Sequence, residues 1–173
     1  IYQCDWSSDV CSSDLLPQVI SEVNNRLSVL KSVTDWESFS TKLKSELISN
    51  IVETSFASIV PNTKDPKKDA EPDLYIDDKP LELKTSKTTN CWRGGEFSKR
   101  ESDYLLIAWD EIDDNFKWFV CWTHLKESDW KSSTSSNYYA TTIDIDDVLK
   151  LEQTDILMGE TVKKRVKNHV CFL

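Results

Sequence analysis

The sequence predicts an α/β fold, in the broad sense that includes α+β, with helices packed on a mixed β-sheet. Two observations support this prediction. Apolar residues recur at helical spacing in roughly the first third of the chain. Short apolar runs bounded by turn residues follow them, which is typical of strands. No internal repeat is visible, and residues 16–173 are enough for a single domain with its own core.

The first fifteen residues are predicted to be a non-native leader. The string CDWSSDVCSSDL, from Cys4 to Leu15, resembles the in-frame translation of a sequencing-library adapter. It is rich in serine and aspartate, and it lacks the basic start and the apolar stretch of a signal peptide. A disordered polar leader is the alternative. In either case we expect no function in residues 1–15, and a loss of native N-terminal residues stays open.

Two helices are expected before the strands. The first covers residues 16–33, where apolar residues follow a helical period. The second is expected to begin at TDWE, because Thr34 and Glu37 have the spacing of a capping box, and to end near Ile59, before Pro61. The apolar stripe of this second helix is predicted to consist of Trp36, Phe39, Leu43, Leu47 and Ile51.

The strands are predicted from apolar and alternating runs. The segment 73–86 is expected to form a strand, a turn and a strand, and a loop containing Gly94 and Gly95, with a short helix after it, should follow. The remaining predicted elements are strands over 103–110, 116–125 and 138–145, a serine-rich loop over 128–137 and a short helix over 146–151. Residues 116–125 are apolar on both faces, which indicates a central strand with Trp118, Val120 and Trp122 on one side and Phe119 and Cys121 on the other.

Composition excludes several classes of protein. The net charge is −9, or −6 without the three aspartates of the leader, which argues against non-specific coating of nucleic acid. The cysteines form no CxxC pair, and His124 and His169 belong to no metal motif. No apolar run is long enough for a membrane span. Basic residues nevertheless gather in 84–100 and in KKRVK, residues 163–167, and the second group is interpreted as a solvated face.

The segment EPDLYIDDKPLELK, residues 71–84, carries the strongest chemical signal. Side chains alternate across a strand, so Glu82 and Lys84 share a face, and a short turn can bring Asp73 onto it. Two carboxylates about 4 Å apart repel by roughly 4 kcal/mol at an effective dielectric of about 20, which favours a cation between them. Oxygen ligands suit Mg²⁺, and a neighbouring lysine can orient a water. The pattern indicates metal-assisted phosphodiester hydrolysis; a solvated edge strand with surface ion pairs is the alternative.

These residues resemble a known family. EPD followed by LELK is similar to the PD-(D/E)xK nuclease core, and WRGGEFSKRESDYLLIAWD is similar to type II restriction endonucleases. The resemblance covers residues 46–122 loosely and 71–109 well. It implies a restriction-endonuclease-like central mixed β-sheet flanked by helices. By position, it implies that Asp73 and Glu82 bind Mg²⁺ and that Lys84 assists the attacking water.

The resemblance also implies further metal ligands. Leu83 lies between Glu82 and Lys84 and is included in the expected metal site. The family often adds a glutamate from a preceding helix, and Glu53 fits this catalytic and metal-binding role best, with Glu46 second. An ordinary position on the flank of the helix is the alternative for Glu53.

The loop from Lys87 to Arg100 is the segment expected to contact DNA, because lysine and arginine neutralise phosphates and glycine lets a backbone approach closely. The residues expected to face DNA are Lys87, Arg93, Gly94, Ser98, Lys99 and Arg100. Trp92 either stacks on DNA or packs on the sheet.

Together these features predict a sequence-specific, Mg²⁺-dependent double-stranded DNA endonuclease of the type II restriction class. Cutting both strands of a palindrome predicts a homodimer, and the resemblance implies a cognate DNA methyltransferase as genetic partner. We expect no membrane contact and a cytoplasmic location in a bacterium or archaeon. Two alternatives stay open: another PD-(D/E)xK nuclease with a repair, junction-resolving or modification-dependent role, and a non-catalytic DNA-binding module of the same fold.

Overall fold

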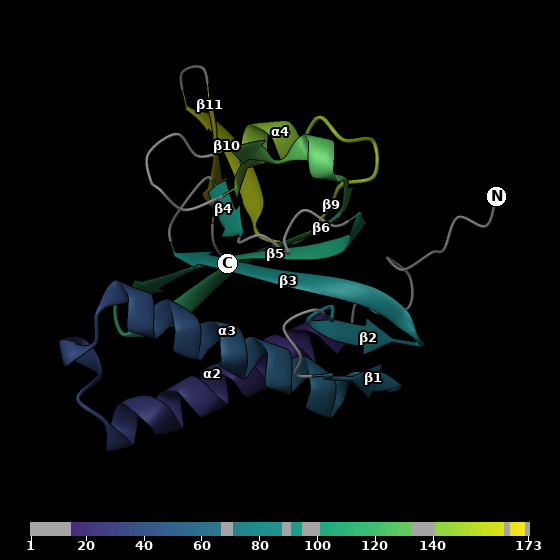
Figure 1. The fold of residues 1–173 in the computed structure, drawn as a ribbon. Helices are drawn as coiled ribbons and strands as arrows, with labels where there is room; N and C mark the ends of the chain where they lie inside the picture. Colours follow the sequence, from purple (N-terminus) through teal and green to yellow (C-terminus); the bar gives the residue numbers. More distant parts are fainter. Residues whose placement is uncertain are drawn as a thin grey trace.

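The computed structural model describes residues 15–66, 71–87, 91–94, 101–132, 141–164 and 167–171 (Figure 1). The predicted leader therefore lies outside the described residues, except for Leu15, which begins the first helix. Two long helices cover one side of a six-stranded sheet, and smaller elements cover the other side (Figure 1). The prediction of helices packed on a mixed sheet is confirmed. Within the described residues, no helix is both long and apolar enough to cross a membrane.

Helix α2 spans Leu15–Val33, as the apolar period predicts. It buries one stripe against the sheet because its apolar residues recur every three or four positions. The second helix differs from the prediction. A 3-10 turn, η1, spans Trp36–Ser38, and α3 begins only at Thr41 and runs to Ile59. The buried residues of α2 are Leu16, Val19, Ile20, Val23 and Leu27.

The predicted capping box at Thr34 is wrong. The Thr34 hydroxyl donates to the carbonyl oxygen of Leu30 (2.7 Å), so it extends the end of α2. The N-cap of α3 is Ser40, whose side chain accepts a hydrogen bond from the Leu43 backbone N–H (3.2 Å). The cause is tertiary: Trp36 is buried in the core, and the chain turns around it before the second helix can start.

The buried face of α3 is also one position away from the predicted stripe. Leu43 is 38% exposed, whereas Lys44 is buried. The ammonium of Lys44 lies 4.9 Å from the centroid of the Trp36 ring, so its aliphatic stem replaces a hydrophobic side chain on the inner face. The residues that α3 buries are Lys44, Ile48, Val52, Ser55 and Phe56.

The main sheet has the strand order β1-β2-β3-β5-β6-β9. Only β3 and β5 are parallel; the other neighbours are antiparallel, so the sheet is mixed. The strands are β1 (Thr63–Lys64), β2 (Leu74–Ile76), β3 (Lys79–Lys87), β5 (Ser102–Ile112), β6 (Asn115–Leu125) and β9 (Asp155–Met158). Strand β9 was not predicted.

The layer opposite α2 and α3 contains a three-stranded sheet of order β4-β8-β7, the short helix α4 and a β-hairpin (Figure 1). The prediction of a loop at residues 91–94 is wrong, because these residues form β4. The predicted short helix after Gly95 lies outside the described residues. The bounds are β4 (Cys91–Gly94), β7 (Lys131–Ser132), β8 (Thr141–Asp144), α4 (Ile145–Val148), β10 (Glu160–Lys164) and β11 (Lys167–Cys171), with a 3-10 turn, η3, at Glu127–Asp129.

Both faces of the central strands are buried, as predicted for β6. Trp118 and Val120 pack in the core beneath α2 and α3, whereas Phe119 and Cys121 pack in the core beneath the small sheet. Burial raises the pKa of the Cys121 thiol to about 12. A strand covered on both sides explains why the aromatic residues of this segment are structural.

Candidate active site

The β2–β3 hairpin fixes the position of the candidate catalytic residues. Asp77 and Asp78 form its two-residue turn with positive φ values of 49° and 62°. Aspartate tolerates this left-handed conformation better than most residues, and such turns match the twist of the two strands. The turn pairs Leu74 with Leu81 across the hairpin. Asp73, one residue before Leu74, is therefore brought close to the middle of β3.

Strand alternation then separates core residues from polar ones. Leu81 and Leu83 are buried in the core beneath α2 and α3. Glu82 and Lys84 point to the other face of the sheet, where Tyr104 is the neighbour of Glu82 on β5. The polar side chains thus lie on the side of the sheet that carries β4 and α4.

The structure brings Asp73, Glu82 and Lys84 together. The Lys84 ammonium lies 3.1 Å from Asp73 Oδ2 and 3.2 Å from Glu82 Oε2. The backbone N–H of Leu83 donates to the same Asp73 oxygen at 2.7 Å. The Asp73 side chain is 32% exposed, that of Lys84 17% and that of Glu82 5%. The cluster is therefore anchored in the sheet and reaches solvent at Asp73.

The donor set fits a hard divalent cation. Asp73 and Glu82 offer carboxylate oxygens, and Leu83 can offer only its main-chain carbonyl oxygen, because its hydrocarbon side chain has no ligand atom. Mg²⁺ commonly takes one or two carboxylates and keeps several waters. Among the described residues, no three His, Cys, Asp or Glu side chains gather as a metal site. The cluster thus offers two carboxylates, and Lys84 places a positive charge between them.

The two candidate glutamates of α3 have different surroundings. Glu46 is exposed, and its carboxylate pairs with Lys42 at 3.8 Å on the helix surface. Glu53 is half-buried on α3, the helix that packs on the opposite face of the sheet from Glu82. Its role as a metal ligand stays a prediction.

The residues predicted to contact DNA do not all lie on one face. The Lys87 ammonium lies 5.4 Å from the centroid of the Trp109 ring, and Trp109 belongs to the core beneath α2 and α3. Lys87 is therefore on the opposite side of β3 from Lys84. Arg93 is exposed on β4, and Gly94 ends that strand. Ser98, Lys99 and Arg100 lie outside the described residues.

Trp92 packs on the sheet, which was one of its two predicted positions. It is fully buried, and its indole N–H donates to the carbonyl oxygen of Ile107 (2.9 Å). Its ring lies against Phe119 on β6. It is therefore an anchor that fixes β4 to the main sheet, and its neighbour Arg93 points outward because side chains alternate.

Sequence reasoning gave no role to Lys131, which the structure places in a row with Arg93. Thr142 on β8 is the Cα partner of Arg93 on one side and of Lys131 on the other. Lys131 forms ion pairs with Asp147 and, at 3.6 Å, with Asp144. The spacing of Lys131 along the sequence gave no signal for this row, because only the pairing of three distant strands creates it.

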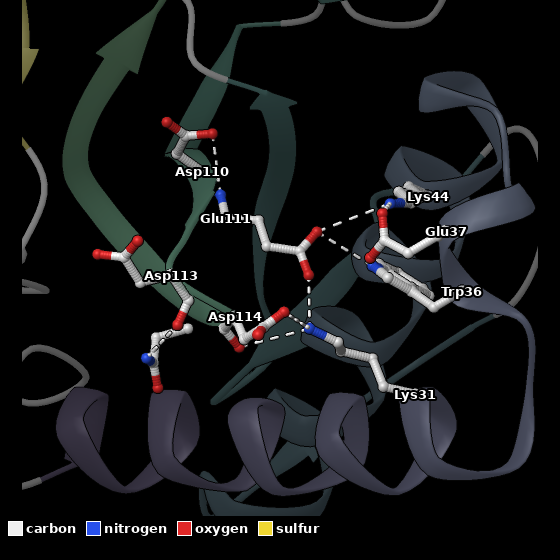
Figure 2. A network of polar contacts seen from close by, with 9 residues as sticks. Lys31, Trp36, Glu37, Lys44, Asp110, Glu111, Asp113 and Asp114 are labelled. Carbon is white, nitrogen blue, oxygen red and sulfur yellow. Dashed lines mark hydrogen bonds and ion pairs between the residues drawn. The ribbon is translucent and has the colours of Figure 1, made fainter.

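A second polar network holds the helical layer to the sheet (Figure 2). Figure 2 shows Glu111, at the end of β5, between Lys31 of α2 and the corner formed by Trp36 and Lys44. Its carboxylate accepts hydrogen bonds from Lys31 Nζ (2.6 Å) and Trp36 Nε1 (3.1 Å), and it lies 3.7 Å from Lys44 Nζ. Burial acts to raise the pKa of Glu111, but these donors and charges outweigh it and leave that pKa below its ordinary value.

The hydrogen bond to Glu111 raises the pKa of Lys31 above its ordinary value, which is consistent with a stable ion pair at neutral pH. This network lies on the helical side of the sheet and takes no part in the Asp73–Glu82–Lys84 cluster. Its role is to fix where α2, η1 and α3 meet the β5–β6 hairpin.

Sequence comparison adds no further evidence about the site: no protein-family model matches the chain, and neither does any curated protein.

Proposed function

We propose that the chain is a Mg²⁺-dependent endonuclease that hydrolyses phosphodiester bonds in double-stranded DNA, of the PD-(D/E)xK type and similar to type II restriction endonucleases. The observation that carries the proposal is the Lys84 ammonium held within 3.2 Å of oxygens of both Asp73 and Glu82. Charged side chains are rarely buried unless they are paired. Holding these three charged side chains together on the sheet therefore costs free energy, and a bound cation and phosphate would offset that cost.

Each residue of the cluster has a distinct task in this proposal. Asp73 and Glu82 hold the cation through carboxylate oxygens. A Mg²⁺ ion held by these two carboxylates would supply Lewis-acid stabilisation of a phosphoryl oxygen and a coordinated water of lowered pKa. Lys84 orients the attacking water and stabilises negative charge on the phosphate. Hydrolysis forms a bond from the water oxygen to phosphorus and breaks the bond to one ester oxygen, which takes up a proton.

The proposed assembly and partners follow from the reaction. Cutting two antiparallel strands at a symmetric sequence requires two equivalent sites, so we propose a homodimer with twofold symmetry. An enzyme of this kind in a bacterial or archaeal cytoplasm would need a cognate methyltransferase to protect the host DNA. The family resemblance keeps Glu53 as the candidate for an additional carboxylate, although α3 packs on the opposite face of the sheet from Glu82.

A digest of unmethylated plasmid and phage DNA, with Mg²⁺ or with EDTA, tests the proposal. Three variants accompany the wild-type chain. Asp73→Asn keeps an oxygen that can accept from the Leu83 N–H but removes the charge, and Lys84→Met keeps the aliphatic stem but removes the ammonium. Lys79→Ala changes an exposed lysine of the same strand and serves as the matched control.

Discrete fragments that require Mg²⁺, persist in Lys79→Ala and vanish in Asp73→Asn and Lys84→Met would support the restriction-type reaction. A smear with the same dependence would favour another nuclease of the same family. Absence of cutting by a wild-type chain with native circular dichroism would contradict the catalytic proposal and favour a DNA-binding module.

A further inference from the structure

The β10–β11 hairpin is a separate basic ribbon. Its two strands pair antiparallel over five residues each, and in the described part of the chain they form a sheet of their own. The register makes Lys164 the Cα partner of Lys167, and Lys163 the Cα partner of Asn168. Two lysines thus occupy directly opposite positions next to the connection between the strands.

The charge of this ribbon is opposite to that of the chain. Residues 160–171 contain four lysines and arginines against the single carboxylate of Glu160, whereas the whole chain has a net charge of −9. Like charges at directly opposite positions destabilise an antiparallel pair. The Lys164–Lys167 pairing is therefore a cost in the free protein that an anionic partner would remove.

The hairpin lies on the side of the main sheet where an anionic partner would also reach the proposed catalytic residues. Figure 1 shows β10 and β11 on the same side of the main sheet as β4 and α4, and α2 and α3 on the other side. Strand β11 lies beside α4. Glu82 and Lys84 point to this same side, and exposed Arg93 belongs to β4. The basic hairpin and the proposed catalytic residues thus lie on the same side of the sheet.

We propose that the β10–β11 hairpin is an arm that contacts the phosphates of duplex DNA and holds the duplex against the catalytic face. This inference rests on the proposed function for its choice of ligand. The major groove of B-DNA, about 12 Å wide, admits a two-stranded ribbon whose strands are about 4.8 Å apart. Contacts to phosphate position a protein without reading sequence, so the arm adds affinity and leaves sequence recognition to other residues.

The test measures binding without cleavage. A fluorescent duplex is titrated with the full chain in EDTA by anisotropy, between about 50 and about 200 mM salt. The variant is Lys164→Gln with Lys167→Gln. The control is Lys42→Gln with Lys79→Gln, which removes the same charge from exposed positions on α3 and at the start of β3. Thermal unfolding of all chains checks that each variant is folded.

Each phosphate contact contributes about 0.9 to the slope of log K against log salt. If both lysines contact phosphates, the slope of the hairpin variant is smaller by about 1.8, and the control keeps the wild-type slope. Equal slopes for the two variants would overturn the inference. So would the absence of duplex binding by the wild-type chain, or a hairpin-dependent affinity for anionic vesicles that exceeds the affinity for DNA.

Failure of the arm and failure of the nuclease proposal give different results. A hairpin-dependent salt slope with no cleavage in Mg²⁺ would support the arm and contradict catalysis. Cleavage in Mg²⁺ with the same salt slope in every chain would support catalysis and contradict the arm.

Discussion

Replacing Glu111 by glutamine tests whether the network in Figure 2 holds the helical layer on the sheet. Glu111 is 13% exposed, and its partners Lys31 and Lys44 are 21% and 9% exposed. The amide keeps an oxygen for Trp36 Nε1 but removes the charge that both ammonium groups share. A hydrogen bond to a charged group contributes about 1.5–3 kcal/mol. Lys44 keeps its contacts with the Trp36 ring and Glu37, so we expect a loss of about 2–3 kcal/mol.

Urea unfolding followed by tryptophan fluorescence gives this change in the free energy of unfolding. In thermal unfolding the same loss should lower Tm by about 4–12 °C, since 1 kcal/mol corresponds to about 2–4 °C for a domain of this size. The matched control is Glu22→Gln, which removes a partner from a surface pair with Arg26. Ion pairs at the surface, such as this partly exposed one within a single helix, contribute about 0–1 kcal/mol.

The effect of Glu111→Gln should depend on pH. The folded-state pKa of Glu111 is below its unfolded value, so its charge stabilises the fold above the unfolded pKa of about 4.3. That contribution is lost as the pH falls through the folded-state pKa, because the carboxyl is then protonated in both states. The difference between wild type and variant should therefore be full at pH 7 and should shrink in acid below that window.

Two results would refute this reasoning. One is a loss at pH 7 no greater than that of Glu22→Gln, which would mean that Lys31 and Lys44 find equivalent partners elsewhere. The other is a loss that stays constant through the acid range, which would show that packing of the side chain, and not its charge, is responsible.

Three further predictions concern other parts of the fold. Cys121 should resist alkylation at pH 8 in the native state and react after unfolding, as peptide mass mapping would detect; rapid native labelling would contradict its burial. Asp78→Val should cost about 1–3 kcal/mol in chemical unfolding, because φ is 62°, whereas Asp78→Gly should not; equal effects would rule out backbone strain as the cause. Trp92→Phe removes the donor to Ile107 and should cost about 1–3 kcal/mol by the same measurement; an unchanged midpoint would show that water replaces this bond.

Much of the fold could be predicted from the periodicity of apolar residues, and the elements that were predicted wrongly have physical explanations. Helix α2 and strands β5 and β6 follow strong patterns, and their burial agrees with them. The start of α3 differs from its predicted position. Thr34 and Glu37 have the spacing of a capping box in the sequence, and only the burial of Trp36 in the folded chain prevents a helix from starting there. Strand β4 was interpreted as a loop, since its pairing with β8 joins residues that are far apart in the chain.

The candidate site was predictable to a similar extent. A two-residue turn and strand alternation are local rules, and they suffice to bring Asp73 near Glu82 and Lys84. The same alternation places Lys87 on the opposite face from Lys84, although the loop was expected to present it to DNA. The row formed by Arg93, Thr142 and Lys131 could not be predicted, because it depends on tertiary pairing of three strands.

Because β3 and β5 are parallel, the segment that connects them is separate from the contacts that position Asp73, Glu82 and Lys84. Two parallel neighbouring strands need a crossover connection that runs from the end of the first strand back to the start of the second. The crossover from β3 to β5 includes β4, which lies on the face of the sheet that carries Lys84 (Figure 1). The positions of Asp73, Glu82 and Lys84 depend on the β2–β3 turn and on the ladder with β5. Insertions or deletions in the crossover would therefore change the surface on this face of the sheet and leave the geometry of the proposed catalytic residues unchanged.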